Sequence, residues 1–562
     1  MLVILDDGAR RVFCDPLAVV EADTCDEVPR ALASVQEALG QGRHVAGWLA
    51  YELGHMLEPR LMADRPPGPL LRLGIFQAPA QQAPRFAGRT YAGTLTPEWD
   101  QKAYAERFAR VKEYIASGDI YQANLSFRAH FPFLGEPRAL YEQLRMKSAA
   151  AHCGFVDDGQ RQILSLSPEL FFDLSPEGDI TAKPMKGTLA RNGDDEIERA
   201  ELAASLKDRA ENLMIVDLIR NDLSRIAQSG SVMVRNLFEV ETYPTLHAMV
   251  STVSARTRCD AGIADILRAL FPCGSVTGAP KIRAMQILRE LESSPRGAYC
   301  GALGYFAPAP DNKFSARFNV AIRTLTIQNG RGELGIGGGV VQDSTAEGEY
   351  AECLLKARFM QAGRRRLELI ETMRHEGTFI RLERHMARMQ ASAARLGLVF
   401  DMAAARAILE EAVSQHQGAL RVRLALDEEG IFHANVQALA PNPDYWTYAI
   451  SAQPTDSTDQ LLGHKTNWRE IYDDQVRRFG TDEVVFCNQK GEITEGARSN
   501  LFVRRGDILL TPPLEAGILP GVLRSELIAE GKAREERLKP EDLAGEFFFG
   551  NSLRGLIAAS PI

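Results

Sequence analysis

The sequence is organised around Pro184-Met185-Lys186-Gly187-Thr188, in which a proline and a glycine enclose a single lysine. This pattern predicts a tight turn that fixes the backbone from which the lysine extends. Two acidic segments lie far from this stretch in sequence, at residues 208–222 and 347–353. Each carries two carboxylates three residues apart, a spacing that places both on one face of a helix. The pairs are Asp208 with Glu211 and Glu349 with Glu352.

The four carboxylates predict a metal site. Carboxylates that converge repel one another unless a cation joins them, and hard oxygen ligands favour Mg²⁺. An amine such as Lys186 beside a carboxylate-held Mg²⁺ indicates nucleophilic chemistry on a small anionic substrate.

The composition argues against several other classes of protein. The chain has 562 residues, 45% hydrophobic and 25% charged, which is typical of a globular protein with two or three domains. A net charge of −9 provides no basic field for nucleic acid, and no apolar run reaches the roughly 18 residues that span a membrane. Two aspartates directly after the apolar Met1–Leu5 argue against a signal peptide, and eight scattered cysteines are typical of reduced thiols in the cytoplasm.

A change in composition at residues 361–366, Gln-Ala-Gly-Arg-Arg-Arg, predicts a domain boundary. We expect one domain at residues 1–361 and a second at 366–562. The expected elements that bear on the later argument are a helix at 28–39, a strand at 162–167, a capping box from Ser344 to Glu347, a strand at 367–372, a helix at 382–396 and strands within 420–438.

Further groups of the first domain could bind substrate carboxylates. The triplet Gly337-Gly338-Gly339 permits close approach to backbone donors, and Arg323 can form a charge-assisted pair of hydrogen bonds. The stretch Gly274–Lys281 is not a phosphate-binding loop, because it lacks the required glycine spacing and Pro280 interrupts it. Chorismate, with two carboxylates and a ring hydroxyl that can leave, is a substrate that would need these groups.

Together the motifs resemble the chorismate-utilising family that contains anthranilate synthase, isochorismate synthase and aminodeoxychorismate synthase component I. The resemblance covers residues 95–360 strongly and Ala46–Leu53 more faintly, and it includes Ser167-Pro168-Glu169, Lys186-Gly187-Thr188 and Tyr243–His247. It implies an α+β fold, a β-sandwich with helices like that of anthranilate synthase component I. It also implies that Glu211 and Glu352 bind Mg²⁺ directly, with Asp208 and Glu349 nearby. The residues implied to line the substrate are Thr188, His247, Thr277, Tyr299, Arg323, Gly337, Gly339 and Lys356.

Lys186 distinguishes two branches of this family, because anthranilate synthases have alanine there and the aminodeoxychorismate branch has lysine. The resemblance implies that the Lys186 amine adds to ring carbon C2 as the C4 hydroxyl leaves, and that ammonia then enters at C4 and expels the lysine. Glu169 would protonate the departing hydroxyl and later take a proton from ammonia. A separate glutamine amidotransferase subunit is implied as the source of ammonia, since no cysteine lies in a Gly-x-Cys-x-Gly elbow.

The second domain contains the groups that pyridoxal phosphate requires, which are a lysine, an acid facing the pyridine nitrogen and donors for the phosphate. Lys465, Glu495 and a helix N-terminus near Ile518-Leu519 meet these needs in turn. The ordered set resembles fold-type IV pyridoxal-phosphate enzymes, which are α+β proteins.

Within that family the resemblance implies that Arg388, in a His385-x-x-Arg388 step, also binds the cofactor phosphate. Ser499 and Asn500 are implied to belong to the cofactor site, and the chain is implied to form a homodimer through this domain. The stretch Phe549–Gly555 is most similar to the aminodeoxychorismate lyase of the family.

One departure concerns the start of the domain at Leu367, which lacks the longer N-terminal strand pair of stand-alone members. We expect the first half of the chain to cover the edge that this leaves.

The two resemblances imply consecutive reactions. The product of the first, 4-amino-4-deoxychorismate, is the substrate of the lyase, which yields 4-aminobenzoate and pyruvate for folate synthesis. An alternative is an anthranilate synthase component I joined to a branched-chain or D-amino-acid aminotransferase, which Lys186 disfavours. A catalytically inactive chorismate-binding paralogue would lack at least one of six groups that are all present: Glu169, Lys186, Glu211, Glu352, Lys465 and Glu495.

Overall fold

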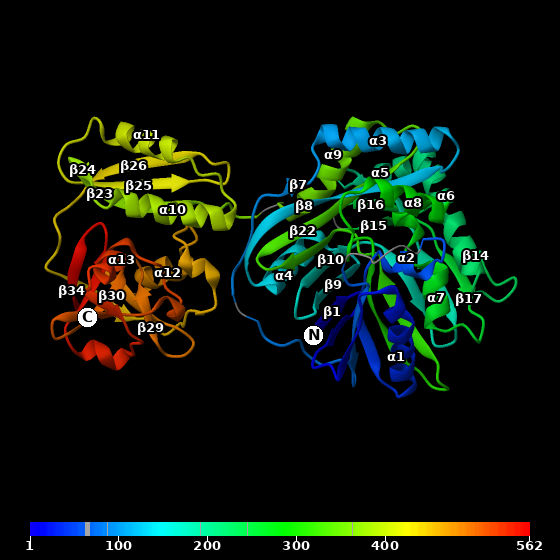
Figure 1. Cartoon of the computed structure of the whole chain (residues 1–562), viewed down its shortest axis with the longest axis horizontal. Coiled ribbons are helices and arrows are strands. Elements are labelled where there is room, and N and C mark those ends of the chain that lie inside the picture. Colours follow the sequence, from blue (N-terminus) through cyan, green and yellow to red (C-terminus); the bar gives the residue numbers. More distant parts are fainter. Residues whose placement is uncertain (62–67, 87, 192, 244–245, 362–363, 562) are drawn as a thin grey trace. The chain divides into compact units, whose positions relative to one another are not determined.

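The structure is a computed structural model that describes residues 1–61, 68–86, 88–191, 193–243, 246–361 and 364–561 (Figure 1). The backbone contacts divide the chain into two compact units. Unit 1 comprises Met1–Arg85, Leu95–Phe131 and Leu140–Ala362, and unit 2 comprises Phe86–Thr94, Pro132–Ala139 and Gly363–Ile562. The two short segments of unit 2 lie in the sequence range that composition assigns to the first domain.

Two large antiparallel sheets form the framework of unit 1. The first has the order β18 (Gly278–Ala279), β8 (Gln122–Gly135), β22 (Arg331–Val340), β21 (Thr324–Gln328), β10 (Gln162–Ser167), β9 (His152–Asp157), β1 (Leu2–Asp6) and β2 (Arg10–Phe13), with β7 (Thr96–Pro97) also paired to β8. The second has the order β14 (Met233–Val234), β17 (Val253–Arg256), β12 (Asp179–Lys183), β11 (Leu170–Leu174), β20 (Phe314–Asn319), β19 (Ala302–Pro308), β4 (His44–Leu49), β5 (Leu71–Phe76) and β3 (Ala18–Ala22).

Apolar side chains from both sheets meet in one core. Val3 and Phe13 of the first sheet pack in the same buried cluster as Trp48 and Phe76 of the second. Strands in such an arrangement bury alternate residues between the sheets, as in a β-sandwich. The expected α+β sandwich is therefore confirmed for unit 1.

A small third sheet and nine helices complete the described part of unit 1. The sheet has the order β13 (Met185–Ala190), β16 (Leu246–Val250) and β15 (Glu239–Thr242). The helices are α1 (Val28–Gly40), α2 (Leu53–Leu57), α3 (Gln101–Ala116), α4 (Pro137–Ser148), α5 (Asp195–Ala204), α6 (Leu206–Ser224), α7 (Ile263–Leu270), α8 (Lys281–Leu291) and α9 (Ala346–Ala357), with 3₁₀ turns η1 (Cys25–Glu27), η2 (Gly274–Val276) and η3 (Arg358–Met360).

The predicted turn around Lys186 is wrong, because Met185–Ala190 form strand β13. The register of β13 against β16 shifts between Met185 and Thr188, which marks a bulge. Gly187 lies in this bulge with φ of +86°, a left-handed value that glycine adopts without strain. The glycine therefore serves an irregular strand rather than a turn.

The predicted capping box at Ser344 is also wrong. Helix α9 is capped by Thr345, whose side chain accepts a hydrogen bond from the Gly348 N–H. The Ser344 hydroxyl instead donates to the carboxylate of Glu349 at 2.7 Å. Gly337-Gly338-Gly339 lie inside strand β22.

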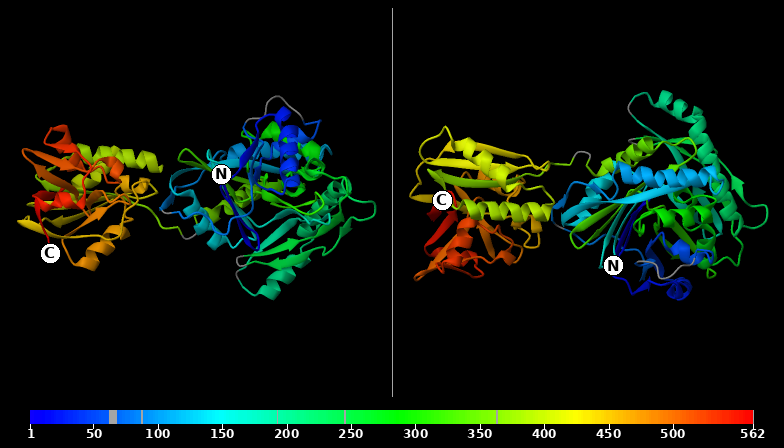
Figure 2. Two further views of the ribbon diagram at one scale, coloured as in Figure 1. Left: turned by 90° about the horizontal axis from the view of Figure 1, so that it is seen from below. Right: turned by 45° about the horizontal axis from the view of Figure 1, so that its top comes forward.

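Unit 2 contains two sheets with helices against them (Figures 1 and 2). The smaller has the order β24 (Thr378–Phe379), β23 (Leu369–Glu376), β25 (Leu420–Leu426) and β26 (Phe432–Ala438), and the larger has the order β29 (Ile493–Gly496), β28 (Glu483–Cys487), β27 (Tyr445–Ile450), β34 (Gly555–Pro561), β33 (Phe547–Asn551), β30 (Asn500–Arg505), β31 (Ile508–Thr511) and β32 (Ala533–Glu535). The helices are α10 (Leu382–Leu396), α11 (Met402–Val413), α12 (Glu470–Phe479) and α13 (Val522–Ala529), with 3₁₀ turns η4 (Gln460–Gly463), η5 (Leu514–Ala516) and η6 (Pro540–Ala544).

Unit 2 also includes a strand pair from the first half of the chain. Strand β6 (Thr90–Ala92) pairs with the last residues of β8, with Tyr91 opposite Leu134. Both side chains are buried in one cluster with Leu367 and Met386.

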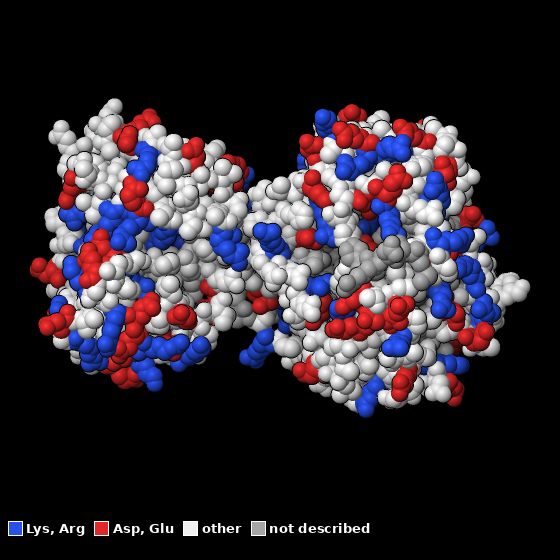
Figure 3. Space-filling view, viewed as in Figure 1, with Lys and Arg blue, Asp and Glu red and all other residues white. Residues whose placement is uncertain are grey.

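The strongest sequence patterns agree with the observed elements. The predicted strand at 162–167 is β10, and the predicted helix at 382–396 is α10, which lies against β23. Among the described residues, no helix has the length and apolarity to cross a membrane. On the face drawn in Figure 3, basic and acidic side chains are interspersed.

Candidate functional site

In unit 1, the amine of Lys186 lies beside the glycines of strand β22. A Cβ atom added to Gly339 would lie 3.2 Å from the Lys186 Nζ and 2.5 Å from the Gln122 Nε2. A side chain at Gly339 would therefore occupy the space next to the amine. The predicted nucleophile Lys186 and the predicted substrate-binding residue Gly339 therefore lie next to one another.

Gln122 is a site residue that was not predicted from the sequence. Its side chain is buried, and neither amide atom has a hydrogen-bond partner among the described residues. A buried amide without a partner is costly, so its place beside Lys186 points to a bound ligand group or water. The surrounding Gly-Asp-Ile-Tyr-Gln stretch carries no spacing that would single out this glutamine.

Burial lowers the pKa of Lys186, and the charge of Lys356 acts in the same direction. The carboxylates of Glu211, Glu169 and Glu352 oppose this shift, so all three lie within electrostatic range of the amine. A lowered pKa increases the neutral, nucleophilic fraction of the lysine.

Glu169 sits between strands β10 and β11 and is buried. Its backbone is fixed by two bonds, one from its own N–H to the Ser167 hydroxyl and one from the Val320 N–H to its carbonyl. Burial raises the pKa of the Glu169 carboxyl to about 7. Its Oε1 atom has no hydrogen-bond partner in the described part of the chain, so the group can exchange a proton with a ligand.

The predicted Mg²⁺ ligands come from helices α6 and α9, which confirms that both acidic segments are helical. Burial raises the pKa of Glu211, and the charges of Asp208 and Glu349 raise it further. This accumulation of negative charge suits a divalent cation. Glu352 pairs with Lys356 of the same helix at 2.8 Å. No three of the four ligand residues bring their oxygen atoms within 4.8 Å of one another.

A different group of metal-ligating side chains does meet that distance. Asp195 and Glu198 of α5 and His247 of β16 have ligand atoms within 4.8 Å of one another. The His247 Nε2 lies 3.4 Å from each carboxylate, and its Nδ1 contacts the Thr242 hydroxyl at 3.0 Å. The ring of His247, predicted to line the substrate, thus faces α5.

Two predicted substrate-binding groups lie on or beside β22. A Cβ atom on Gly337 would come within 2.4 Å of the Ser126 hydroxyl, so only glycine fits there. The amine of Lys356 donates to the Gly337 carbonyl at 3.1 Å.

Arg323 precedes strand β21 with a left-handed φ of +48°. Its side chain has no carboxylate or hydrogen-bond partner in the described part of the chain, and burial lowers its pKa. An unpaired, partly buried guanidinium is suited to a substrate carboxylate.

The remaining predicted substrate groups differ in exposure. Thr277 is buried and its hydroxyl donates to the Gly274 carbonyl at 3.1 Å, whereas Thr188 is exposed. The ring of Tyr299 packs over Gly335 of β22. Pro244 and Thr245 of the Tyr243–His247 motif lie outside the described residues.

Lys281 ends the stretch Gly274–Lys281, which superficially resembles a phosphate-binding loop, and its amine has partners inside the protein. Its amine pairs with the buried Asp222 of α6 and donates to the Leu270 carbonyl at 3.0 Å. The lysine is therefore committed to an internal ion pair.

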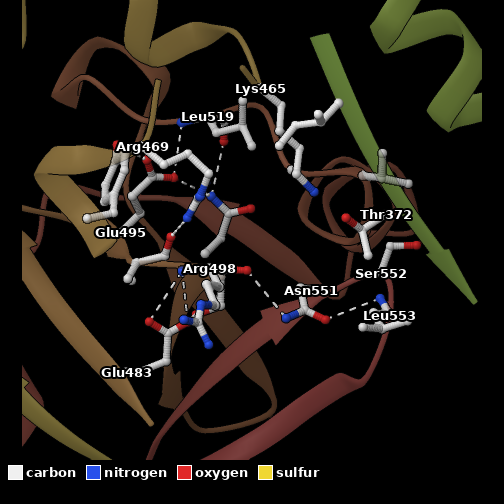
Figure 4. Close-up of a pocket in the computed structure, with 18 of the residues that line it drawn as sticks. Thr372, Lys465, Arg469, Glu483, Glu495, Arg498, Leu519, Asn551, Ser552 and Leu553 are labelled. Atoms are coloured by element: carbon white, nitrogen blue, oxygen red, sulfur yellow. Dashed lines mark hydrogen bonds between the residues drawn. The ribbon is translucent and has the colours of Figure 1, made fainter. Parts of the chain in front are cut away.

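In unit 2, a cavity of about 1020 Å³ contains Lys465 and Glu495 (Figure 4). The backbone of Lys465 is held by a hydrogen bond from the Ile370 N–H of β23 to its carbonyl, at 2.8 Å. Burial lowers the pKa of the Lys465 amine to about 8. Figure 4 shows Lys465 and Glu495 reaching the cavity from different segments.

Three donors surround the buried carboxylate of Glu495. The Tyr472 hydroxyl donates at 2.8 Å, the Leu519 N–H at 3.1 Å and the Asn500 amide at 3.4 Å. Burial nevertheless raises the pKa of Glu495 to about 7. Tyr472, which belongs to helix α12, was not among the predicted site residues, although it lies seven residues after Lys465 in the sequence.

Arg388 extends from α10 and is oriented by Glu371 of β23. Its Nε and one terminal nitrogen donate to the two Glu371 oxygens at 2.8 and 2.6 Å. The other terminal nitrogen donates to the Pro520 carbonyl at 3.1 Å. His385 also contacts Glu371, at 2.7 Å, and contacts the Ser552 hydroxyl at 2.8 Å. Glu371 could not be predicted from the sequence, because a carboxylate inside an apolar strand has no recognisable pattern.

The predicted helix start near Ile518 is wrong by several residues. Helix α13 begins at Val522 with Gly521 as its N-cap. Ile518 is buried and does not line the cavity, whereas Leu519, Gly521, Val522 and Leu523 do. Two residues delay the start of the helix. Gly517 adopts a left-handed φ of +86°, and Pro520 has no backbone N–H to donate to a helical hydrogen bond.

Ser499 and Asn500 both line the cavity, but they use their side chains within the protein. The Ser499 hydroxyl donates to Glu483 at 2.7 Å, and the Asn500 amide donates to the Leu519 carbonyl at 3.0 Å. Asn500 thereby joins the Glu495 strand to the loop before α13.

Comparison with known proteins identifies both units. Residues 77–362, just over half of the chain, match the family model for chorismate binding enzymes. Residues 368–562 match the model for class IV amino-transferases. The expected order of a chorismate-binding region followed by a fold-type IV domain is confirmed.

Curated relatives resemble the first region. Aminodeoxychorismate synthase component 1 from Klebsiella aerogenes is 44% identical over 276 residues, 49% of this chain and 60% of the relative. The protein of the same name from Escherichia coli K12 is 46% identical over 266 residues, 46% of this chain and 58% of the relative. The chain thus spans about 60% of the length of these relatives.

Among solved structures, anthranilate synthase component I from Streptococcus pneumoniae is 24% identical, with a TM-score of 0.55. The match covers 64% of this chain and 92% of that one. It supports the assigned fold of unit 1.

Proposed function

The chain belongs to the family of chorismate binding enzymes, and from this premise we propose that it makes 4-aminobenzoate from chorismate in two reactions. Unit 1 aminates chorismate to 4-amino-4-deoxychorismate, and unit 2 eliminates pyruvate from that intermediate. The observation that carries the proposal is the amine of Lys186, which lies at Gly339 next to the unpartnered Gln122 amide and within electrostatic range of the buried Glu169 carboxyl. The similarity to two aminodeoxychorismate synthase components supports it.

In the first reaction, the neutral Lys186 amine adds to ring carbon C2 of chorismate. The ring double bonds shift and the C4–O bond breaks, while Glu169 donates a proton so that water leaves. Ammonia then adds at C4, the double bonds shift back and the C2–N bond to Lys186 breaks. Glu169 takes the proton that ammonia loses, so the chain returns to its starting state.

The anionic groups of chorismate require cationic partners. We propose that Mg²⁺ on Glu211 and Glu352, with Asp208 and Glu349 nearby, binds one substrate carboxylate. Arg323 and the β22 backbone around Gly337 and Gly339 bind the other. The unpaired guanidinium of Arg323 and the raised pKa of Glu211 support this arrangement.

The class IV amino-transferase match implies pyridoxal phosphate in unit 2, and the cavity groups fit it. Lys465 would bind it covalently, Glu495 would face its pyridine nitrogen, and Arg388 with the N-terminus of α13 would hold its phosphate. When bound, the cofactor withdraws electrons from the substrate carbon that bears the amine.

The second reaction removes the proton at C4 and breaks the bond from C3 to the enolpyruvyl oxygen. Pyruvate leaves and the ring becomes aromatic. Lys465, whose pKa is about 8, moves the C4 proton. Tyr472 and Asn500 hold Glu495 in place for this step.

We further propose that a separate glutamine amidotransferase subunit supplies the ammonia and that the chain forms a homodimer through unit 2. The eight cysteines are all unpaired, which supports work in the reducing cytoplasm.

The proposed function is tested with purified chain, chorismate, Mg²⁺ and an ammonium salt. Wild type should release 4-aminobenzoate, which chromatography separates from 2-aminobenzoate. Lys186→Ala should lose at least about a hundredfold of this activity, because the substitution removes the proposed nucleophile. The same variant should convert supplied 4-amino-4-deoxychorismate at the wild-type rate. Release of 2-aminobenzoate as the main wild-type product would contradict the proposal and favour an anthranilate synthase.

A further inference from the structure

Two segments from the first half of the chain belong to unit 2. Tyr91 and Leu134, opposite one another in the β6–β8 pair, are each 1% exposed and pack with Leu367. The Tyr91 hydroxyl donates to the Leu396 carbonyl at the end of α10, at 3.1 Å. Arg364 donates to the Ala92 carbonyl at 2.9 Å. This strand pair is therefore an integral part of the unit that carries Lys465.

The pair brings one side chain to the cavity. Arg89, directly before β6, lines the same cavity as Lys465. Its Nε donates to the Asp459 carboxylate at 2.8 Å, and one terminal nitrogen donates to the Trp468 carbonyl at 3.1 Å. In the described part of the chain, no acceptor bonds to its second terminal nitrogen. The guanidinium is thus held in place and keeps donors for a ligand.

Asp459 is well suited to hold this arginine. Its side chain is 7% exposed, and one of its oxygens also accepts a hydrogen bond from the Leu461 N–H at 2.9 Å, which caps η4. The Asp459 carboxylate is therefore held in place independently of Arg89. Because two nitrogens of Arg89 are already bonded, its side chain loses little further entropy when it binds a ligand.

The charge of the cavity favours a ligand with more than one anionic group. Seven arginines and Lys465 line it, against four carboxylates. Arg388 is already shared between Glu371 and the proposed phosphate site. A second anion, remote from the reacting amine, needs another fixed guanidinium.

We propose that Arg89 is a specificity residue of unit 2 that binds a carboxylate of a dicarboxylate substrate. The proposal rests on the proposed function in so far as 4-amino-4-deoxychorismate is that substrate. It assigns a substrate contact of the second reaction to a residue from the first half of the chain. A monocarboxylate ligand would make little use of Arg89.

The test uses the full-length holoenzyme and 4-amino-4-deoxychorismate supplied as substrate. Chorismate, a dicarboxylate without the amine, and benzoate, a monocarboxylate, serve as inhibitors of pyruvate release. Arg89→Gln should raise the KM and the chorismate Ki by about tenfold or more, the usual effect of losing a charge-assisted hydrogen bond. The benzoate Ki and kcat should change less than twofold. Arg89→Lys should recover part of the chorismate affinity.

Arg85→Gln is the matched control, since Arg85 is exposed, lies four residues earlier and is not among the cavity residues. It should leave both Ki values at wild type. If Arg89 only anchored the strand pair, Arg89→Gln would weaken both inhibitors alike and lower the Tm, and an unchanged ratio of the two Ki values overturns the proposal.

The cofactor absorbance, titrated with chorismate or benzoate, reports ligand binding in unit 2 without turnover. If wild type released no pyruvate, the proposed function would fail. The titration would still show whether Arg89→Gln selectively weakens the dicarboxylate, so the two failures are distinguishable.

Discussion

At the scale of single residues, Glu169 shows how burial prepares a group for acid–base chemistry. The carboxyl is 3% exposed, one of its oxygens has no hydrogen-bond partner among the described residues, and its pKa is raised to about 7. A carboxylic acid in water is almost fully ionised at that pH. Burial thus keeps a transferable proton on Glu169 at neutral pH.

This gives a prediction for the pH dependence of the first reaction. Protonated Glu169 exists below its pKa, so kcat/KM for chorismate should fall about tenfold per pH unit above pH 7, at constant free ammonia. Neutral Lys186 sets the opposite limb, because its amine must lose a proton before it adds. The measurement is chorismate consumption from pH 6 to 9.

Glu169→Gln provides the control, since an amide cannot titrate. The variant should be slow and should lack the descending limb. A wild-type profile that stays level between pH 7 and 9 would remove Glu169 from the role of acid.

A functional residue can be predicted from the sequence when its neighbours along the chain form a motif. It cannot be predicted when its role arises only from residues that the fold brings next to it. Lys186, Glu169 and Lys465 were predicted from their surroundings along the chain. Gln122 and Glu371 were not, because an amide on β8 and a carboxylate on β23 become significant only once folding brings Lys186 or Arg388 beside them.

At the scale of elements, helices α6 and α9 each present two carboxylates to the same region of unit 1. The three-residue spacing predicted this, because a helix repeats its face every 3.6 residues. The distances between the carboxylates of the two helices could not be predicted from this spacing. They depend on competing partners, such as Lys356 for Glu352 and Ser344 for Glu349.

The two helices carry a prediction about the metal. Glu211→Gln and Glu352→Gln should each raise the Mg²⁺ concentration for half-maximal chorismate amination by about tenfold or more, because each removes one anionic ligand. The measurement is activity against free Mg²⁺. Asp217→Asn is the matched control, since Asp217 lies on the exposed face of α6 and pairs with Arg220. Metal dependence identical to wild type in both glutamine variants would show that the ion binds elsewhere.

Local irregularities account for the elements that were predicted wrongly. Gly187 and Pro184 indicate a turn by composition, but the pairing of β13 with β16 converts the glycine into a bulge. At α13 the sequence has two breakers, Gly517 and Pro520, before the first residue that can propagate a helix. Glycine and proline in the sequence indicate that the backbone is irregular at these positions. Whether the irregularity is a turn, a bulge or a delayed helix start depends on the tertiary packing.

At the scale of the whole molecule, a composition break near residue 362 predicts a domain boundary, and the main body of unit 2 comprises Gly363–Ile562. The break could not reveal that Phe86–Thr94 and Pro132–Ala139 also belong to unit 2, because both segments read as ordinary parts of the first domain. The short start at Leu367 was the only sign. It led us to expect that the first half of the chain covers the exposed edge, but it did not show which residues would do so. Non-local packing of this kind has no signature in local periodicity.

The final prediction concerns the independence of the two reactions. No residue is common to the two proposed catalytic sets, since Lys186 and Glu169 act on the ring of chorismate and Lys465 acts on the amine at C4. Lys465→Ala should therefore lose the absorbance of lysine-bound cofactor and stop 4-aminobenzoate release. Chorismate should still be consumed at the wild-type rate when ammonia and Mg²⁺ are present, and 4-amino-4-deoxychorismate should accumulate in solution. An added active lyase should then restore 4-aminobenzoate, whereas a simultaneous loss of chorismate consumption would show that the first reaction depends on the second site.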